Sequence, residues 1–71
     1  MKMEKELLPH QVRVLFEQEE LNEKLQKLIA FLDTNVFASL DKDEQELLLK
    51  QREAMGEYNF ILIERIKMFS T

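Results

Sequence analysis

The chain has no cysteine and only one histidine, His10, among its 71 residues. Without cysteine it can form no disulfide, no thiolate zinc site and no cysteine nucleophile, so nothing in it requires an oxidising compartment. A domain this small buries only about 60% of the surface of its unfolded chain. It therefore usually needs disulfides, a metal or oligomerisation for stability. Oligomerisation is the route that remains, and we expect a homo-oligomer.

Long apolar runs are also missing. The most apolar stretch, residues 60–63, is far too short to cross a bilayer, and no long apolar run follows the charged residues 1–6. We therefore expect a cytoplasmic protein that is neither secreted nor membrane-spanning. Ten basic residues against fourteen acidic ones give a net charge of −4, which opposes binding to duplex nucleic acid or to an anionic membrane.

Glycine and proline occur once each, which is typical of long helices. Pro9 suits the first turn of a helix, and apolar residues then recur at alternating spacings of three and four to about residue 33. Short polar side chains interrupt the pattern over residues 34–40. Asp41 and Glu44 resemble a capping box that begins a second helix, continuing to about residue 69. The sequence predicts a single all-α domain, 1–71, folded as a two-helix antiparallel hairpin.

The second predicted helix is apolar on more than one side. At about 100° per residue, one broad face is expected to pack on the first helix: Leu47, Leu48, Gln51, Ala54, Met55, Tyr58, Ile61, Leu62 and Phe69. Near the opposite side lie Leu49, Gly56, Phe60 and Ile63. One hairpin cannot cover both sides, and rows of exposed apolar groups usually mark an interface. These last four residues are the predicted oligomer interface.

The side chains that could carry chemistry are few. His10 has no serine, cysteine or paired carboxylate placed as its partner, and the glutamates at 17, 19, 20 and 23 lack the histidines of di-metal bundles. We therefore predict no catalytic residue, no metal site and no cofactor, and a protein that is not an enzyme. His10 is then either a solvated residue or a ligand contact.

Polar groups on the predicted packing face need partners, and two explanations remain open. One is a structural contact that fixes the register, such as Gln51 facing Gln18. The other is a pocket between protomers, in which arginines bind phosphate and a tyrosine stacks on a base.

Residues 51–58, with the motif Gln-x-x-Ala-Met-x-x-Tyr, resemble a family of very small phage and prophage proteins known mainly as crAss-phage-related hypothetical proteins. Residues 10–14, His-Gln-x-Arg-Val, and residues 37–40, Phe-x-x-Leu, resemble the same family. The resemblance covers about residues 9–69. The sequence departs from the family's pattern at residues 14–16, where charged residues are often found, and at Asn59 and Phe60.

The resemblance implies a phage accessory protein in the host cytoplasm. Small helical-hairpin oligomers of phages include sponges that sequester the cyclic nucleotide or cyclic ADP-ribose signals of bacterial immunity. On this hypothesis the ligand-binding residues, shared between subunits, are Arg13, Arg52, Tyr58 and Arg65. Two alternatives are a module that inhibits or adapts a host protein through an apolar helical face, and a structural phage component.

Overall fold

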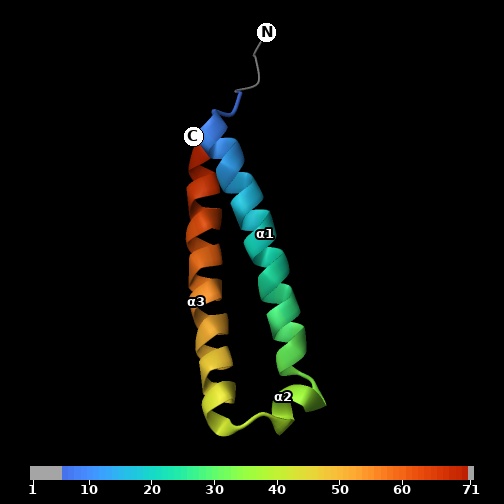
Figure 1. The fold of residues 1–71 in the computed structure, drawn as a ribbon. Helices are drawn as coiled ribbons and strands as arrows, with labels where there is room; N and C mark the ends of the chain where they lie inside the picture. Colours follow the sequence, from blue (N-terminus) through green and yellow to red (C-terminus); the bar gives the residue numbers. More distant parts are fainter. Residues whose placement is uncertain (1–5, 71) are drawn as a thin grey trace.

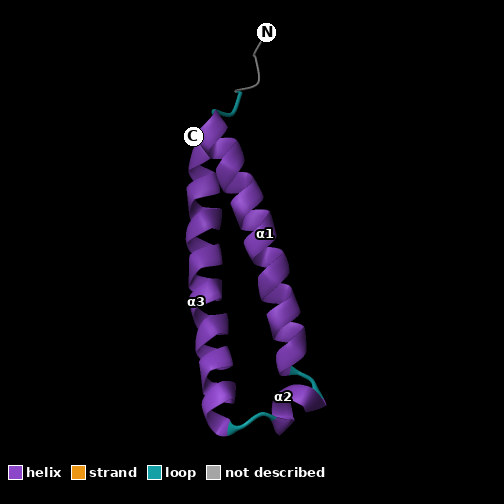
Figure 2. Ribbon diagram, viewed as in Figure 1, coloured by secondary structure: helices purple, strands orange, loops and turns teal. Residues whose placement is uncertain are grey.

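The computed structural model describes residues 6–70, and every element in that range is helical. Helix α1 spans Pro9–Leu32, α2 spans Asn35–Ser39 and α3 spans Lys42–Lys67, followed by a 3-10 turn, η1, at Met68–Ser70. Figure 1 shows α1 and α3 side by side and running in opposite directions, with α2 at the connection between them. The predicted all-α class is confirmed, and Figure 2 shows that the loops are confined to short segments.

The ends of the helices follow from local hydrogen bonds. The Gln11 side chain accepts a hydrogen bond from the Leu8 N–H at 2.8 Å, which satisfies one of the free donors where α1 begins. The backbone N–H groups of Asp33 and Thr34 then donate to carbonyls of the last turn of α1. Thr34 Oγ1 accepts from the Phe37 N–H at 3.2 Å. This cap allows the short helix α2 to form inside the connection, where the sequence predicted a turn.

The start of α3 differs from the predicted capping box, because the Asp41 side chain makes no capping hydrogen bond. Instead, Gln45 Nε2 donates to the carbonyl oxygens of Phe37 at 2.9 Å and Ala38 at 3.2 Å. The first turn of α3 is thus tied to the end of α2 by an amide side chain. Asp43 and Glu44, both in this first turn, still complement the helix dipole.

The core is one narrow seam between α1 and α3. Its buried residues are Val14, Leu21, Leu25 and Leu62. Met55, Ile66 and Phe69 are partly buried against this core. The packing face of α3 is narrower than predicted, since Leu47, Gln51, Ala54, Tyr58 and Ile61 are exposed. A hairpin gives α3 a single neighbour, and one neighbour covers only a narrow stripe. Here that stripe consists of residues 48, 55, 62 and 69, which repeat every seven positions, with Asn59 and Ile66 beside them.

A polar pair crosses the seam beside this core. Gln18 Nε2 donates to Asn59 Oδ1 at 3.0 Å, and the pair is partly buried. The suggested contact between Gln18 and Gln51 is therefore wrong: Gln51 lies two helical turns from Asn59, is exposed, and directs its amide to Met55 Sδ. The Gln18–Asn59 bond fixes the register, because any axial slip between the helices would leave both amides without their partner.

The hairpin is long and leaves much of its apolar surface uncovered. It measures 59 × 16 × 15 Å and has a radius of gyration of 16.7 Å, whereas a compact domain of this length has about 11 Å. Its accessible surface is 5955 Å², against about 4,700 Å² for a compact protein of the same mass. Among the described residues, twelve large hydrophobic side chains are exposed and four hydrophobic side chains are buried. None of the helices within residues 6–70 is long and apolar enough to cross a membrane.

Candidate functional site

The Gln18–Asn59 hydrogen bond distinguishes two opposite faces of the hairpin. Gln18 lies to one side of the seam on α1, and Asn59 lies to one side of the seam on α3. Because these two residues are hydrogen-bonded, the Gln18 side of α1 and the Asn59 side of α3 belong to the same face of the hairpin. At about 100° per residue, the same side of α3 carries one glycine and several large apolar residues. We call this surface the Gly56 face and define it by Leu49, Gly56, Phe60 and Ile63.

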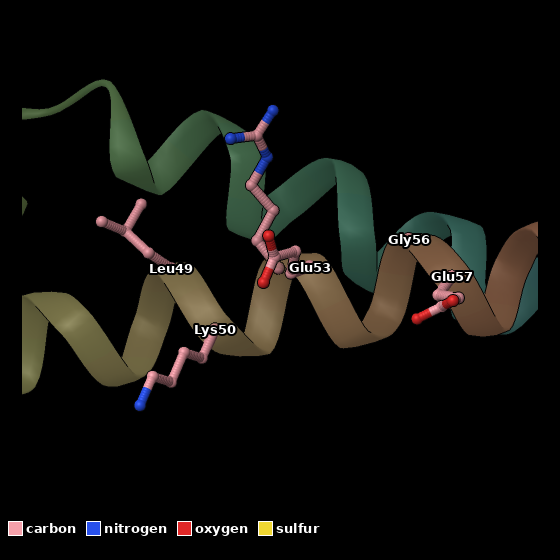
Figure 3. A pocket seen from close by; sticks show the side chains of 6 residues that line it. Leu49, Lys50, Glu53, Gly56 and Glu57 are labelled. Atoms are coloured by element: carbon pink, nitrogen blue, oxygen red, sulfur yellow. The ribbon is translucent and has the colours of Figure 1, made fainter.

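An open hollow lies on the Gly56 face. It has a volume of about 510 Å³ and is lined by Leu49, Lys50, Arg52, Glu53, Gly56 and Glu57. Figure 3 shows Leu49 rising toward α1 and Lys50 pointing away from it. A Cβ atom built on Gly56 would meet nothing within 4 Å. The hairpin itself therefore gives no steric reason for a glycine at this position.

The predicted interface residues lie together on this face and are open to solvent. Phe60 is 60% exposed, Leu49 45% and Ile63 36%. Within residues 6–70 a large part of each of these three side chains stays uncovered, and an exposed apolar patch of this kind usually serves an interaction. What covers the patch stays a prediction.

Three of the four predicted ligand-binding residues lie on the other face. Tyr58 and Arg65 are seven residues apart, so they project from the same side of α3, away from Gly56. Gln18 and Asn59 lie at the same level along the hairpin, because they are hydrogen-bonded. The two helices are antiparallel, so five residues back along α1 from Gln18 corresponds to five residues forward along α3 from Asn59. Arg13 therefore lies level with Glu64, the neighbour of Arg65. We call this surface the Arg65 face and define it by Arg13, Tyr58 and Arg65.

Arg52 is not part of the Arg65 face. It lines the hollow on the Gly56 face, well over 90° of helix rotation from Tyr58 and Arg65. A single hairpin therefore brings together three of the predicted ligand-binding residues and separates the fourth.

The two arginines of the Arg65 face are available to bind an anion. Both are exposed, and within residues 6–70 neither forms an ion pair. The nearby Glu64 carboxylate accepts instead from Lys67 Nζ at 3.0 Å. Beside them, Phe60, Ile61, Glu64, Arg65 and Met68 line a second open hollow of about 450 Å³. This end of the molecule thus combines guanidinium groups, a tyrosine that is 43% exposed and an apolar surface.

Asn59, which was not among the residues predicted from the sequence, is the partner of Gln18 across the seam. The signal was present, because Arg52, Asn59 and Ile66 repeat every seven residues beside the buried stripe of α3. The placement of Ile61 and Met68 beside Arg65 in one hollow was also not predicted. His10 is exposed in the first turn of α1 and belongs to neither face as defined.

Comparison with known proteins identifies a family for the chain. The model of the Sequestin family matches residues 8–68, a range that contains both long helices and the connection between them. No curated protein and no solved structure matches the chain. The family's name suggests a sequestering, non-enzymatic role, and the link to crAss-phage proteins stays a prediction. Since the match extends over most of its length, the chain belongs to the Sequestin family.

Proposed function

We propose that the protein is a phage counter-defence protein that acts without chemistry: a homo-oligomer that binds a cyclic nucleotide or cyclic ADP-ribose type immune signal and keeps it from its host receptor. The observation that carries the proposal is the Arg65 face, where two arginines that form no ion pair within residues 6–70 share a surface with an exposed tyrosine. Membership of a family named for sequestration supports the same role.

The chemistry of the Arg65 face suits this class of ligand. Guanidinium groups form paired, charge-assisted hydrogen bonds to phosphate oxygens. Arg13 and Arg65 project from different helices at the same level, so both can bind one phosphate or two neighbouring ones. Tyr58 lies about two turns along α3 from Arg65, which is about 10 Å at 1.5 Å per residue. A base attached to the bound phosphate can reach the tyrosine ring and stack on it.

Association completes the proposed site. The hollow beside Arg65 is open to solvent, whereas most small-molecule sites enclose more than two thirds of the ligand. A further protomer packed against the Arg65 face would enclose the ligand, in addition to any contact that the Gly56 face makes. Arg52, which lines the hollow on the Gly56 face, can reach that ligand only from a neighbouring protomer. Oligomerisation would then serve both the stability of the hairpin and the capture of the signal.

The exposed Gly56 face favours one other function, an interaction with a host protein through an apolar helical surface. The two functions differ in their ligand. A signal-binding protein responds to free nucleotides, whereas an interaction module does not.

Alanine substitutions on the Arg65 face test the proposed site. Arg13→Ala, Tyr58→Ala and Arg65→Ala should each raise the dissociation constant for the captured signal about 10- to 100-fold, because a charged hydrogen bond or a stacked base contributes about 1.5–3 kcal/mol. The oligomer mass should not change. Isothermal titration calorimetry and light scattering measure the two quantities.

The matched control is Lys27→Ala, which removes one positive charge from an exposed position on α1 far from Arg13. Its effect on binding should be small. If Lys27→Ala weakened binding as much as Arg65→Ala does, capture would depend on net charge rather than on a site at the Arg65 face.

A further inference from the structure

We propose that the Gly56 face binds the same face of a second copy of this chain, with the two α3 helices antiparallel and the two-fold axis passing between their Gly56 residues. This inference rests on the proposed self-association and specifies its geometry. Four features of the described residues support it: the glycine itself, the spacing of its neighbours, the fit of Phe60 to the hollow, and the area available.

Gly56 is the first of these features. A helix with glycine in its middle is less stable than the same helix with alanine there. In the hairpin, a Cβ atom at position 56 would meet nothing within 4 Å. The hairpin would therefore gain stability from a larger residue here. A two-fold axis gives the glycine a function, because the residue on the axis faces its own copy and limits how closely the two backbones approach.

The residues on either side of Gly56 are complementary in this arrangement. Leu49 lies seven residues before Gly56 and Ile63 lies seven residues after it. In an antiparallel pair centred on residue 56, each Leu49 faces the partner's Ile63, and this contact occurs twice. Spacing of seven residues also keeps all three positions on one side of α3, as in antiparallel coiled coils.

Phe60 fits the hollow in the same register. Phe60 lies four residues after Gly56. In an antiparallel pair centred on Gly56, it therefore faces the residue four positions before Gly56 in the partner, which is Arg52. Arg52 is one of the residues that line the hollow of about 510 Å³. Phe60 is 60% exposed in the single hairpin and would enter the partner's hollow as a knob enters a hole. By symmetry, both aromatic rings and both hollows are used.

The exposed area is sufficient for such a dimer. The hairpin's 5955 Å² of accessible surface exceeds that of a compact protein of its mass by roughly 1,300 Å². A stable interface of standard size removes about 800 Å² from each partner. An interface of that size is smaller than the excess surface of the hairpin, so the elongated hairpin has enough uncovered surface to form it.

Single cysteines introduced into this cysteine-free chain test the geometry. A disulfide requires the two Cα atoms to lie about 4.4–6.8 Å apart. Gly56→Cys should form a disulfide-linked dimer under mild oxidation. Leu49→Cys alone should not, because two copies of residue 49 would be about 21 Å apart along the paired helices. Ile63→Cys alone should also form no disulfide-linked dimer, for the same reason. An equimolar mixture of the Leu49→Cys and Ile63→Cys proteins should form the mixed disulfide. The control is Tyr58→Cys, on the opposite face, which should form no cross-link.

Each outcome decides the inference. Cross-linking of the mixture and of Gly56→Cys, with helical circular dichroism equal to the wild type, supports it; where Gly56→Cys does not fold, the mixture alone decides. Self-cross-linking of Leu49→Cys would overturn it in favour of parallel pairing. No cross-link in the mixture, with an oligomeric mass for the uncross-linked proteins, would overturn this interface but leave ligand capture by the Arg65 face intact, since calorimetry measures that separately. A monomeric wild type would overturn both the interface and the proposed oligomer.

Discussion

Phe60→Asp is expected to dissociate the proposed oligomer into single hairpins. A carboxylate placed where Phe60 meets a partner would be buried without a counter-ion, which costs several kcal/mol. Since every 1.4 kcal/mol is a factor of ten, the dissociation constant should rise at least about 100-fold. The hairpin itself should change little, because Phe60 is 60% exposed within it and surface substitutions usually alter stability by less than about 0.5 kcal/mol. Light scattering at micromolar concentration measures the change in mass.

Phe16→Asp is the matched control for this experiment. Phe16 is 62% exposed, nearly the same as Phe60, but it lies on α1 and outside the Gly56 face. The same chemical change there should leave the mass of the oligomer unaltered. Equal dissociation by both variants would mean that association depends on general apolar exposure and not on the Gly56 face.

Leu62→Ala should have the largest effect on the stability of the fold. Leu62 is 0% exposed and is the centre of the cluster formed with Val14 and Leu21. Truncating a fully buried leucine costs about 2–5 kcal/mol, a large share of the total of about 5–15 kcal/mol for a typical domain. The midpoint of thermal unfolding should fall by on the order of 10–30 °C. Circular dichroism at a fixed protein concentration measures it, because association also shifts the midpoint.

Leu47→Ala makes the same chemical change on α3 at a residue that is 64% exposed. Its cost should stay below about 1 kcal/mol. A comparable loss of stability in the two variants would show that α3 packs on α1 through the broader face predicted from the sequence, with Leu47 inside the seam.

Much of the fold could be predicted from the sequence because long helices are encoded locally. Three local features together indicate the first helix: the scarcity of glycine and proline, the position of Pro9, and the spacing of the apolar residues from Val14 to Leu32. The width of the packing face could not be predicted in the same way. The periodicity of core residues includes Leu47, Tyr58 and Ile61. Whether these residues are buried depends on how many helices pack against α3, and that number cannot be predicted from the periodicity.

The connection and the polar seam illustrate a second limit. Helix α2 depends on one hydroxyl cap, Thr34, and the start of α3 depends on Gln45 reaching the carbonyls of α2 rather than on Asp41. The pairing of Gln18 with Asn59 depends on the axial register of two helices, which a difference of one turn would change. Such contacts follow from three-dimensional placement, so the sequence indicated which polar residues needed partners but not which partners they have.

The separation of the predicted ligand residues into two faces has the same origin. Arg52, Tyr58 and Arg65 lie within 14 positions of one helix, and from spacing alone they could be assigned to one pocket. Because successive residues rotate about the helix axis, Arg52 lies on the Gly56 face. The antiparallel register places Arg13 of α1 next to Arg65. The sequence hypothesis already grouped Arg13 with residues of α3, and the antiparallel hairpin gives the geometric reason why Arg13 and Arg65 can lie on one face.

Sequestration of a phosphate-bearing signal is the central claim, and calorimetric titration of the wild-type protein tests it most directly. The ligands are cyclic dinucleotides, cyclic trinucleotides and cyclic ADP-ribose isomers, with mass spectrometry of the ligand recovered after heat denaturation. We expect saturable binding of at least one of them, in fixed proportion to the protein, and recovery of the ligand unchanged. Absence of binding to every one of these signals, or recovery of a chemically altered ligand, would contradict it.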